Sequence, residues 1–448
     1  MKKYNSQYEK MSKQSIPSLL IQLSVPTILT MMVTSIYNMA DTAFVGQLGT
    51  SASGAVGVVF GYMSILQAIG FMHGQGSGSI VARKLGEKDT DGASIFTSTG
   101  FFSSMFFGLI VAILTFIFID PVINLLGSTE TIAPYAKIYI TFIALAAPAQ
   151  TASFTMNNML RFEGKAVLGM MGMMTGSILN IVLDPILMFG FDMGMAGAGL
   201  STCLTQYISF FILLSMYLRH KTQSKLSLKK IDFGQYFEIL TTGFPSLLRQ
   251  GLNSLATIIL NLEAAVYGDA AVAAFSIVSR IAMFVFSIAL GVGQGFQPIS
   301  SFSYGAKKYS RLREGFKDAI ILSEAVIAVL SFLVFIQADY LIEVFRDDPE
   351  VVLIGTRALK LQIIAQIFMP FGMVIEMLHQ STGQKLGATV MSGCRSGFIF
   401  IPALLILAKL RGLSGIQEAQ PLAYVLSLIP AIFFGKTYFD KLPKEDGV

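Results

Sequence analysis

Charge is scarce in this chain of 448 residues. Charged residues make up 13% of it, apolar residues make up 53%, and the mean hydropathy is +0.65. A soluble globular protein normally carries charge on about a quarter of its residues, because its surface has to be hydrated. So little charge excludes an ordinary soluble protein of this length, and it predicts a surface that faces lipid.

Cysteine and histidine are also rare. Cys203 and Cys394 both lie in apolar segments, which excludes a disulfide framework and a zinc site. His73, His220 and His379 are scattered and lack metal-ligand spacing. The sequence contains no ATP-binding motif and no convincing catalytic constellation, so we expect neither an enzyme nor a bound cofactor. The net charge of +5 is spread over many short loops, so we also expect no nucleic-acid partner.

Long apolar runs fill most of the chain. About 20 apolar residues in a helix cross the ~30 Å hydrocarbon core of a bilayer. The runs are too long and too continuous for the alternating strands of a membrane β-barrel. The sequence therefore predicts an all-α membrane protein with twelve transmembrane helices. The expected spans are 17–45, 53–83, 93–119, 131–160, 166–191, 196–219, 236–267, 270–303, 315–338, 350–381, 387–409 and 417–437.

Charges in the connections alternate in sign, as the positive-inside rule requires. One side holds acids, with Arg346, Lys409 and Arg411 as its few basic exceptions. The first span is too long for a removable signal peptide and lacks a small-residue cleavage site, so we expect it to be retained. We predict a multi-pass protein of the cell membrane with both termini cytoplasmic. The basic side collects Lys2, Lys3, Lys10, Lys13, Arg83, Lys84, Lys88, Arg161, Lys165, Arg219, Lys221, Lys225, Lys229, Lys230, Lys307, Lys308, Arg311, Arg313, Lys317, Lys436, Lys441 and Lys444.

The two halves of the chain repeat one another. A single constant offset aligns Pro26 with Pro245, and it aligns the triplet 74–76 with the triplet 293–295, both of which read Gly-Gln-Gly. Six spans per half is an even number, so both halves start from the same side of the membrane, which is typical of alternating-access transporters. The predicted organisation is a cytoplasmic segment 1–16, an N-terminal six-helix lobe 17–219, a linker 220–235, a C-terminal six-helix lobe 236–438 and a cytoplasmic tail 439–448.

Two carboxylates interrupt apolar spans in the N-terminal lobe. Asp41 lies one to two turns inside the outer end of the first span, and Asp184 lies about two turns before the outer end of the fifth. Asn180 is one turn deeper on the same helix face as Asp184, and Thr202 lies roughly two turns into the sixth span. An acid within a span is costly unless it is paired, hydrated or protonated. These oxygen ligands suit Na⁺, and the acid pair equally suits a proton.

The C-terminal lobe departs from this pattern. The position equivalent to Asp41 is Leu260, and apolar residues surround the equivalent of Asp184. This lobe instead carries Glu263 near the outer rim and Glu376 near the inner end of its span. We expect these two acids not to touch, and Glu376 is the better candidate for a cation or substrate contact. By contrast, the glycines at 74, 76 and 78 predict close helix packing, because no Lys-Ser/Thr follows to complete a phosphate loop.

The motifs of the chain resemble those of the multidrug and toxic compound extrusion (MATE) family, in its bacterial DNA-damage-inducible (DinF-like) branch. The resemblance covers residues 15–438. Its motifs are Pro26, Asp41-Thr42-Ala43-Phe44-Val45-Gly46, Gly74-Gln75-Gly76, Asn180 with Asp184-Pro185, Gly194-Met195-Ala196-Gly197-Ala198, Gly243-Phe244-Pro245 and Gln380-Ser381-Thr382-Gly383-Gln384.

The resemblance implies two six-helix bundles and export of organic, often cationic and lipophilic compounds by alternating access in exchange for Na⁺ or H⁺. It implies an ion site at Asp41, Asn180, Asp184 and Thr202, with supporting neighbours at Tyr37 and Asn157. A different branch of the family uses acids in spans 7 and 10, which Glu263 and Glu376 match only loosely. We expect a monomer whose partners are small organic substrates, the coupling ion and the bilayer.

Three other functions compete with this prediction. A lipid-linked oligosaccharide flippase of the same superfamily would carry a strongly cationic cavity, whereas the sequence predicts mostly acidic intramembrane charges. An integral membrane enzyme would need a constellation of His, Asp or Ser at the interface. A passive channel would not need buried acids in only one of two similar lobes.

Overall fold

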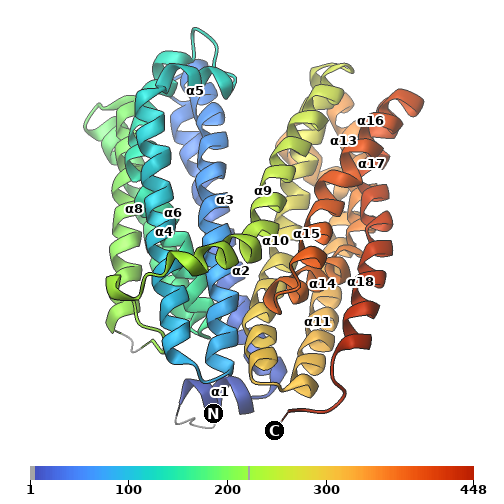
Figure 1. The fold of residues 1–448 in the computed structure, drawn as a ribbon. Helices are drawn as coiled ribbons and strands as arrows, with labels where there is room; N and C mark the ends of the chain where they lie inside the picture. The colour runs from blue at the N-terminus through green and yellow to red at the C-terminus, as the bar shows by residue number, and fades with distance from the viewer. Residues whose placement is uncertain (1–5, 220–221, 448) are drawn as a thin grey trace. The chain divides into compact units, whose positions relative to one another are not determined.

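The computed structural model describes residues 6–219 and 222–447. Predicted features at 1–5, 220–221 and 448, among them Lys2, Lys3, His220 and Lys221, lie outside the described residues. Every regular element in the described chain is a helix (Figure 1), which confirms the all-α prediction. Within this part of the chain, nine helices are long and apolar enough to cross a membrane, and a bent pair of helices makes a tenth span.

The N-terminal half contains six long helices, one of them ending in a π-helix, and two short ones. Each of the first six predicted spans coincides with one of the long helices. The elements are α1 (Gln7–Lys13), α2 (Ile16–Gly46), α3 (Thr50–Gly86), α4 (Thr90–Ile117), α5 (Ile119–Leu125), α6 (Ala133–Phe162), α7 (Ala166–Pro185), the π-helix η1 (Ile186–Gly190) and α8 (Gly194–Arg219).

The C-terminal half follows two short 3₁₀ turns in the linker, η2 (Leu228–Lys230) and η3 (Phe233–Gln235). Its six predicted spans also coincide with helices, but the last three are interrupted. The elements are α9 (Tyr236–Ala265), α10 (Asp269–Gly305), α11 (Tyr309–Ile336), α12 (Ala338–Phe345), α13 (Pro349–Gln366), α14 (Met369–Ser381), α15 (Lys385–Gly393), the π-helix η4 (Cys394–Phe398), α16 (Phe400–Arg411), α17 (Leu413–Leu426) and α18 (Leu428–Lys441).

The breaks in these spans have local causes. Helices α13 and α14 meet at an angle of 50°, and Pro370 occupies the first turn of α14. Proline lacks an N–H group and its ring collides with the preceding turn, so a helix bends or restarts where it occurs. The π-helix η4 adds a residue to one turn between α15 and α16. Apolar length alone predicts a span but not such breaks.

The chain divides into two compact units whose borders lie inside helices. Unit 1 comprises Leu29–Leu247 with the N-terminal residues up to Tyr8, and unit 2 comprises Glu9–Ile28 and Leu248–Val448. The first part of α2 therefore packs within unit 2, and the first part of α9 packs within unit 1. Both borders lie two residues after a proline, Pro26 in α2 and Pro245 in α9. The same change of unit is thus repeated in both halves at equivalent positions.

Small residues bring the helices of unit 1 into close contact. Helices α3, α4, α6 and α8 pack side by side (Figure 1). A Cβ atom on Gly74 would lie 2.8 Å from the Asn158 side chain, and one on Gly76 would lie 3.0 Å from the backbone nitrogen of Gly243. A Cβ atom on Gly78 would collide with the ring of Phe162. The prediction of close packing at these glycines is confirmed.

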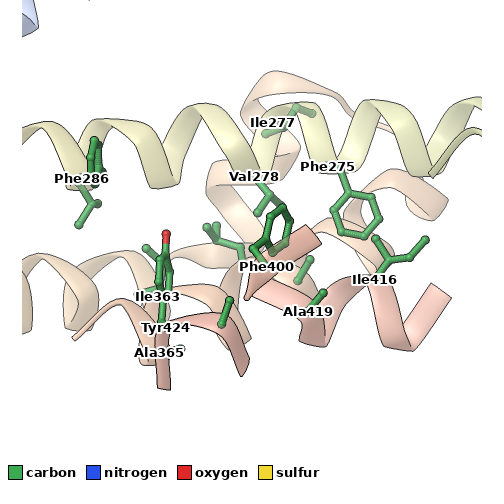
Figure 2. Packing of buried hydrophobic residues seen from close by; sticks show 14 of the residues in the cluster. Phe275, Ile277, Val278, Phe286, Ile363, Ala365, Phe400, Ile416, Ala419 and Tyr424 are labelled. Carbon is green, nitrogen blue, oxygen red and sulfur yellow. The ribbon is translucent and has the colours of Figure 1, made fainter. Parts of the chain in front are cut away.

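Unit 2 is built around an apolar core between α10, α13, α16 and α17. Figure 2 shows Phe275 and Val278 of α10 facing Phe400 of α16 and Ile416 of α17. The glycine equivalent to Gly76 is Gly295, where a Cβ atom would lie 2.8 Å from the backbone nitrogen of Ser24. The two units therefore use the same small-residue contact, each between its Gly-Gln-Gly helix and the first part of α2 or α9.

Candidate cation site

The two predicted acids are buried together in unit 1. Asp41 lies near the end of α2, and Asp184 is the next-to-last residue of α7. Their side chains are 4% and 0% exposed. The two carboxyl groups lie close enough to interact electrostatically. The structure therefore brings together two acids that are far apart in the sequence.

The predicted amide and hydroxyl ligands join the same site. Asn180, one turn before Asp184 on α7, is fully buried. Its Nδ2 atom donates to Ser201 Oγ at 3.1 Å and to Thr202 Oγ1 at 3.3 Å, both on α8. The side-chain oxygen of Asn180 accepts no hydrogen bond from the described residues. Ser201 is a member of the cluster that the sequence prediction omitted.

Two tyrosines flank the acid pair. Tyr37 lies one turn before Asp41 on α2, and it interacts electrostatically with both Asp41 and Asp184. Tyr139 of α6, which the sequence prediction missed, donates its hydroxyl to Asp41 Oδ2 at 2.9 Å. A buried tyrosine hydroxyl requires a partner, but its sequence position does not reveal which acid supplies it. Tyr139 is fully buried and holds Asp41 by one oxygen.

Several buried oxygens of this cluster have no hydrogen-bond partner among the described residues. They are Oδ1 of Asp41, both Oδ atoms of Asp184 and Oδ1 of Asn180. Buried acceptors are normally satisfied, because an unpaired one costs about 1–3 kcal/mol and a charged one costs more. Buried oxygen acceptors that remain unpaired fit a proton or a Na⁺ ion. In the described chain, no group of three or more His, Cys, Asp or Glu side chains forms a transition-metal site.

The backbone around Asp184 is irregular. Pro185 ends α7, and the π-helix Ile186–Gly190 follows it directly. The proline cannot donate a backbone hydrogen bond, so the regular α-helical ladder fails at this point. Single-turn π-helices are frequent at functional sites. The local sequence Asp-Pro thus places the acid at the end of a regular helix.

A small hollow with a cavity volume of about 60 Å³ adjoins the acid pair within unit 1. Tyr37 and Asn180 belong both to its wall and to the acid cluster. The rest of the wall mixes apolar side chains with polar ones, including Gln67, Gln150 and Gln206. The hollow therefore provides a partly polar surface beside the acids.

The remaining predicted site residues lie elsewhere. Asn157 is half-buried on α6 and faces Gly169 of α7, and no contact joins it to the acids in the described chain. Glu263 is half-buried near the end of α9. Glu376 of α14 accepts hydrogen bonds from Arg249 Nη1 at 2.5 Å and from Ser392 Oγ at 2.7 Å. No ion pair or hydrogen bond between described residues joins the two glutamates.

The C-terminal half buries more basic than acidic side chains within its spans. Arg249 of α9 is 3% exposed and Arg395 of η4 is 7% exposed, so unit 2 buries two cations. The sequence prediction of mostly acidic intramembrane charge was therefore wrong for the C-terminal half. Both arginines lie inside predicted spans, 236–267 and 387–409. A basic residue inside an apolar span was the sequence signal that could have predicted these buried cations.

These features define a multi-pass helical membrane protein with two similar halves and a buried acid pair in one of them. The MatE family model matches residues 26–186 and 245–405, which together make up more than half of the chain. The chain therefore belongs to the MatE family of membrane transporters, and it is not an enzyme. The second match begins and ends at the residues that the internal repeat pairs with the bounds of the first, which confirms the repeat.

Curated relatives match over nearly the whole chain. The multidrug export protein MepA of Staphylococcus haemolyticus is 28% identical over 432 residues, covering 94% of this chain and 93% of the relative. MepA of Staphylococcus aureus (strain MSSA476) is 29% identical over 434 residues, covering 96% of each chain. The DinF-like branch suggested by the sequence stays a prediction.

Solved structures share the fold. A transporter of the MOP superfamily from Pyrococcus furiosus superposes with a TM-score of 0.91 at 24% identity, covering 99% of this chain and 100% of that one. A point mutant of the MATE transporter VcmN from Vibrio cholerae superposes with a TM-score of 0.90 at 21% identity, covering 96% of this chain and 98% of that one. These likenesses confirm a MATE-like fold of twelve helices in two six-helix bundles.

Proposed function

We propose that this chain is a cation-coupled antiporter of the cell membrane, with both termini cytoplasmic. It exports small organic compounds, often cationic and lipophilic, by alternating access in exchange for Na⁺ or H⁺. The names of the Staphylococcus relatives, multidrug export proteins, support export of organic compounds. The single observation that supports ion coupling is the set of unpaired oxygens on Asp41, Asp184 and Asn180.

The proposed mechanism begins with the acid pair. Asp41 and Asp184 hold the coupling ion that arrives from outside, and Asn180 and Thr202 supply neutral oxygens next to them. Tyr139 keeps Asp41 in position through its hydroxyl group. With the ion held, the two acids no longer repel one another, so α2 and α7 can pack more closely. This change in the N-terminal lobe favours the state that releases the organic compound outward.

Release of the ion to the cytoplasm then resets the carrier. Coupling of this kind requires that the ion and the organic compound differ in affinity between the two states. The acid pair meets the requirement if its two carboxyl groups are closer in one state than in the other. A single chain contains the whole set of ion ligands, so we propose that a monomer suffices for transport.

Transport into inverted proteoliposomes tests the proposal. A Na⁺ gradient and a pH gradient would be imposed separately, and accumulation of the cationic dye rhodamine 123 would be followed for the native chain, Asp41→Asn and Asp184→Asn. We expect uphill accumulation by the native chain and at least a tenfold loss in both variants. The gradient that drives accumulation identifies the coupling ion.

A matched control is Asp192→Asn, which neutralises an exposed acid near the same end of the N-terminal half. It should transport like the native chain. Uphill transport that survives both Asp41→Asn and Asp184→Asn would refute the proposed ion site but leave export intact. Equilibration of the dye without uphill accumulation under either gradient would refute the antiporter and favour a passive channel.

A further inference from the structure

The C-terminal unit buries a cluster of charged side chains that lies outside the proposed ion site. Arg249 of α9 donates from Nη1 to Glu376 of α14 at 2.5 Å, and Ser392 of α15 donates to the same carboxylate oxygen at 2.7 Å. Arg395 of η4 interacts electrostatically with both Arg249 and Glu376. All four side chains are at least nine-tenths buried. Four elements of one unit therefore meet at a single charged cluster.

The charges of this cluster do not balance. Two guanidinium groups, on Arg249 and Arg395, face one carboxylate, on Glu376. The carboxylate is already occupied by Arg249 and Ser392. One positive charge therefore remains without an anion. A buried charge without a partner is strongly destabilising, and arginine within a span is rare unless it has a function.

Arg395 is the side chain that carries the surplus charge. Its guanidinium lies over the ring of Phe286 on α10, 4.9 Å from the ring centroid. Its Nη2 atom has no hydrogen-bond partner among the described residues. Figure 2 shows Phe286 and Tyr424 at one end of the apolar core, with the hydroxyl of Tyr424 pointing toward α10. An aromatic face supports the cation, but it leaves the N–H edge of the guanidinium available to an acceptor.

The backbone that presents Arg395 is specialised. Arg395 lies in the second position of the π-helix Cys394–Phe398. A Cβ atom on Gly397 would lie 2.5 Å from the side chain of Leu252, one turn after Arg249 on α9. The π-helix and this glycine therefore bring η4 close to α9, and they place Arg395 beside the Arg249–Glu376 pair.

We propose that Arg395, backed by Arg249, binds the carboxylate of anionic or zwitterionic organic substrates. The inference rests on the proposed export function and extends its substrate class beyond cations. A guanidinium presents two parallel N–H donors that match the two oxygens of a carboxylate, and burial strengthens such a pair. The Arg249–Glu376 pair holds the neighbouring carboxylate in place, so Arg395 remains free to accept a negative charge from a substrate.

A matched pair of dyes tests this assignment. Rhodamine 110 carries a free carboxylate where rhodamine 123 carries its methyl ester. Fluorescence polarisation would measure the Kd of each dye for the purified protein in nanodiscs of phosphatidylcholine. In Arg395→Gln we expect the Kd for rhodamine 110 to rise at least tenfold and that for rhodamine 123 to change less than twofold. Arg395→Lys should lie between Arg395→Gln and the native chain for rhodamine 110, because it keeps the charge but loses the paired donors.

The control variant is Arg280→Gln, which removes an exposed arginine from α10 of the same unit. It should leave both Kd values unchanged. Equal weakening of both dyes by Arg395→Gln would show that Arg395 only supports the fold, and it would overturn the assignment. Unchanged affinity for rhodamine 110 in Arg395→Gln would overturn it as well.

Two further binding measurements distinguish a substrate carboxylate from other anions. If replacing phosphatidylcholine with phosphatidylglycerol abolishes the Arg395-dependent binding of rhodamine 110, the site takes a lipid headgroup and the substrate assignment is wrong. If replacing gluconate with chloride does so, the site takes an inorganic anion, and the assignment is equally wrong. Failure of the export proposal is distinguishable, because it is measured by uphill accumulation of rhodamine 123 in the native chain and not by this binding assay.

Discussion

The two halves of the chain share a backbone plan but differ in the charged side chains that they bury within their spans. The offset that aligns their prolines and glycines places Asp41 opposite Leu260 and Asp184 opposite Ala403. In the other direction, Arg249 stands opposite Thr30 and Arg395 opposite Gly176. The N-terminal unit therefore buries two acids with unpaired oxygens, and the C-terminal unit buries two arginines around one acid.

This difference shows which features the repeat preserves. Positions that control the approach of helices are the same in both halves, because a side chain at Gly76 or Gly295 would strike a neighbouring backbone. Positions that face the interior of each unit are not bound by this constraint. These positions hold the charged and polar side chains of the proposed sites, and the two units hold different ones. The proposed ion site and the proposed carboxylate site are thus the products of one scaffold.

The largest expected effect follows from breaking the buried ion pair of the C-terminal unit. Glu376→Gln removes the single carboxylate of the cluster and leaves Arg249 and Arg395 charged, buried and without an anion. We expect a loss of about 3–5 kcal/mol in the free energy of unfolding, because an uncompensated buried charge remains. Thermal unfolding of the purified protein in detergent, followed by circular dichroism, measures the loss as a fall in Tm.

The double variant Glu376→Gln with Arg249→Met supplies the control. It removes both members of the ion pair, keeps similar side-chain volumes and leaves the same net charge as in the native cluster, so it should regain most of the native stability. If the double variant were as unstable as Glu376→Gln alone, the lost packing and hydrogen bonds of Glu376, and not the unpaired charge, would be responsible. The comparison of the buried charges in the two halves would then lose its energetic basis.

A smaller effect is expected from the tyrosine that holds Asp41. Tyr139 has Ala358 as its equivalent in the C-terminal half, so this hydroxyl belongs to the acid site alone. Tyr139→Phe removes a donor that stabilises the charged carboxylate. A hydrogen bond to a charged group contributes about 1.5–3 kcal/mol, so Asp41 should hold the coupling ion more tightly. We expect the ion concentration for half-maximal dye transport to fall by at least about tenfold, since about 1.4 kcal/mol corresponds to a factor of ten.

The matched control for Tyr139→Phe is Tyr62→Phe. Tyr62 is also buried in the N-terminal unit, but its hydroxyl accepts a hydrogen bond from Thr115, 3.0 Å away. Removal of this hydroxyl should leave the ion dependence unchanged. A similar shift in both variants would indicate that loosening of the helices, and not the loss of a donor to Asp41, changes ion binding.

The smallest effect concerns a third buried acid of the N-terminal unit, Glu163, which holds the linker through hydrogen bonds. Glu163 lies between α6 and α7, and its carboxylate accepts hydrogen bonds from the Gln223 backbone N–H at 3.1 Å, the Tyr217 hydroxyl at 3.3 Å and the Ser224 hydroxyl. Burial raises the pKa of Glu163 above its ordinary value of 4.5, although the bonds from Ser224 oppose the shift. The equivalent residue in the other half is the neutral Thr382.

The sign of the pH effect follows from the raised pKa. Folding favours the protonated form of Glu163, so its contribution to linker docking is complete below pH 4.5 and is lost as the pH rises through the raised pKa. Amide hydrogen exchange at Gln223 and Ser224, corrected for its intrinsic pH dependence, should show protection that falls as the pH rises above 4.5. Glu163→Gln should abolish this dependence, and protection that instead increases with pH would contradict the prediction.

The spans and the acid pair were predictable from the sequence for different reasons. A helix in lipid satisfies its backbone internally, so apolar length alone indicates each of the twelve spans. The acids stood out because charge is rare in such runs. Helix periodicity and depth also placed Asn180 and Thr202 at the level of Asp184, and Asn180 bonds to Thr202 in the structure. Asn157, by contrast, faces Gly169, because its orientation depends on how α6 packs against α7.

Composition, hydropathy and the internal repeat by themselves determined that this protein is a helical membrane protein with two similar halves. They did so because the bilayer allows few solutions for an apolar chain, and because a repeated backbone contact requires repeated glycines. Only the tertiary structure decided which polar side chains meet. Tyr139 reaches Asp41 across 98 residues, and Arg249 reaches Glu376 across 127. Such pairings depend on the rotation and approach of whole helices, which local sequence does not encode.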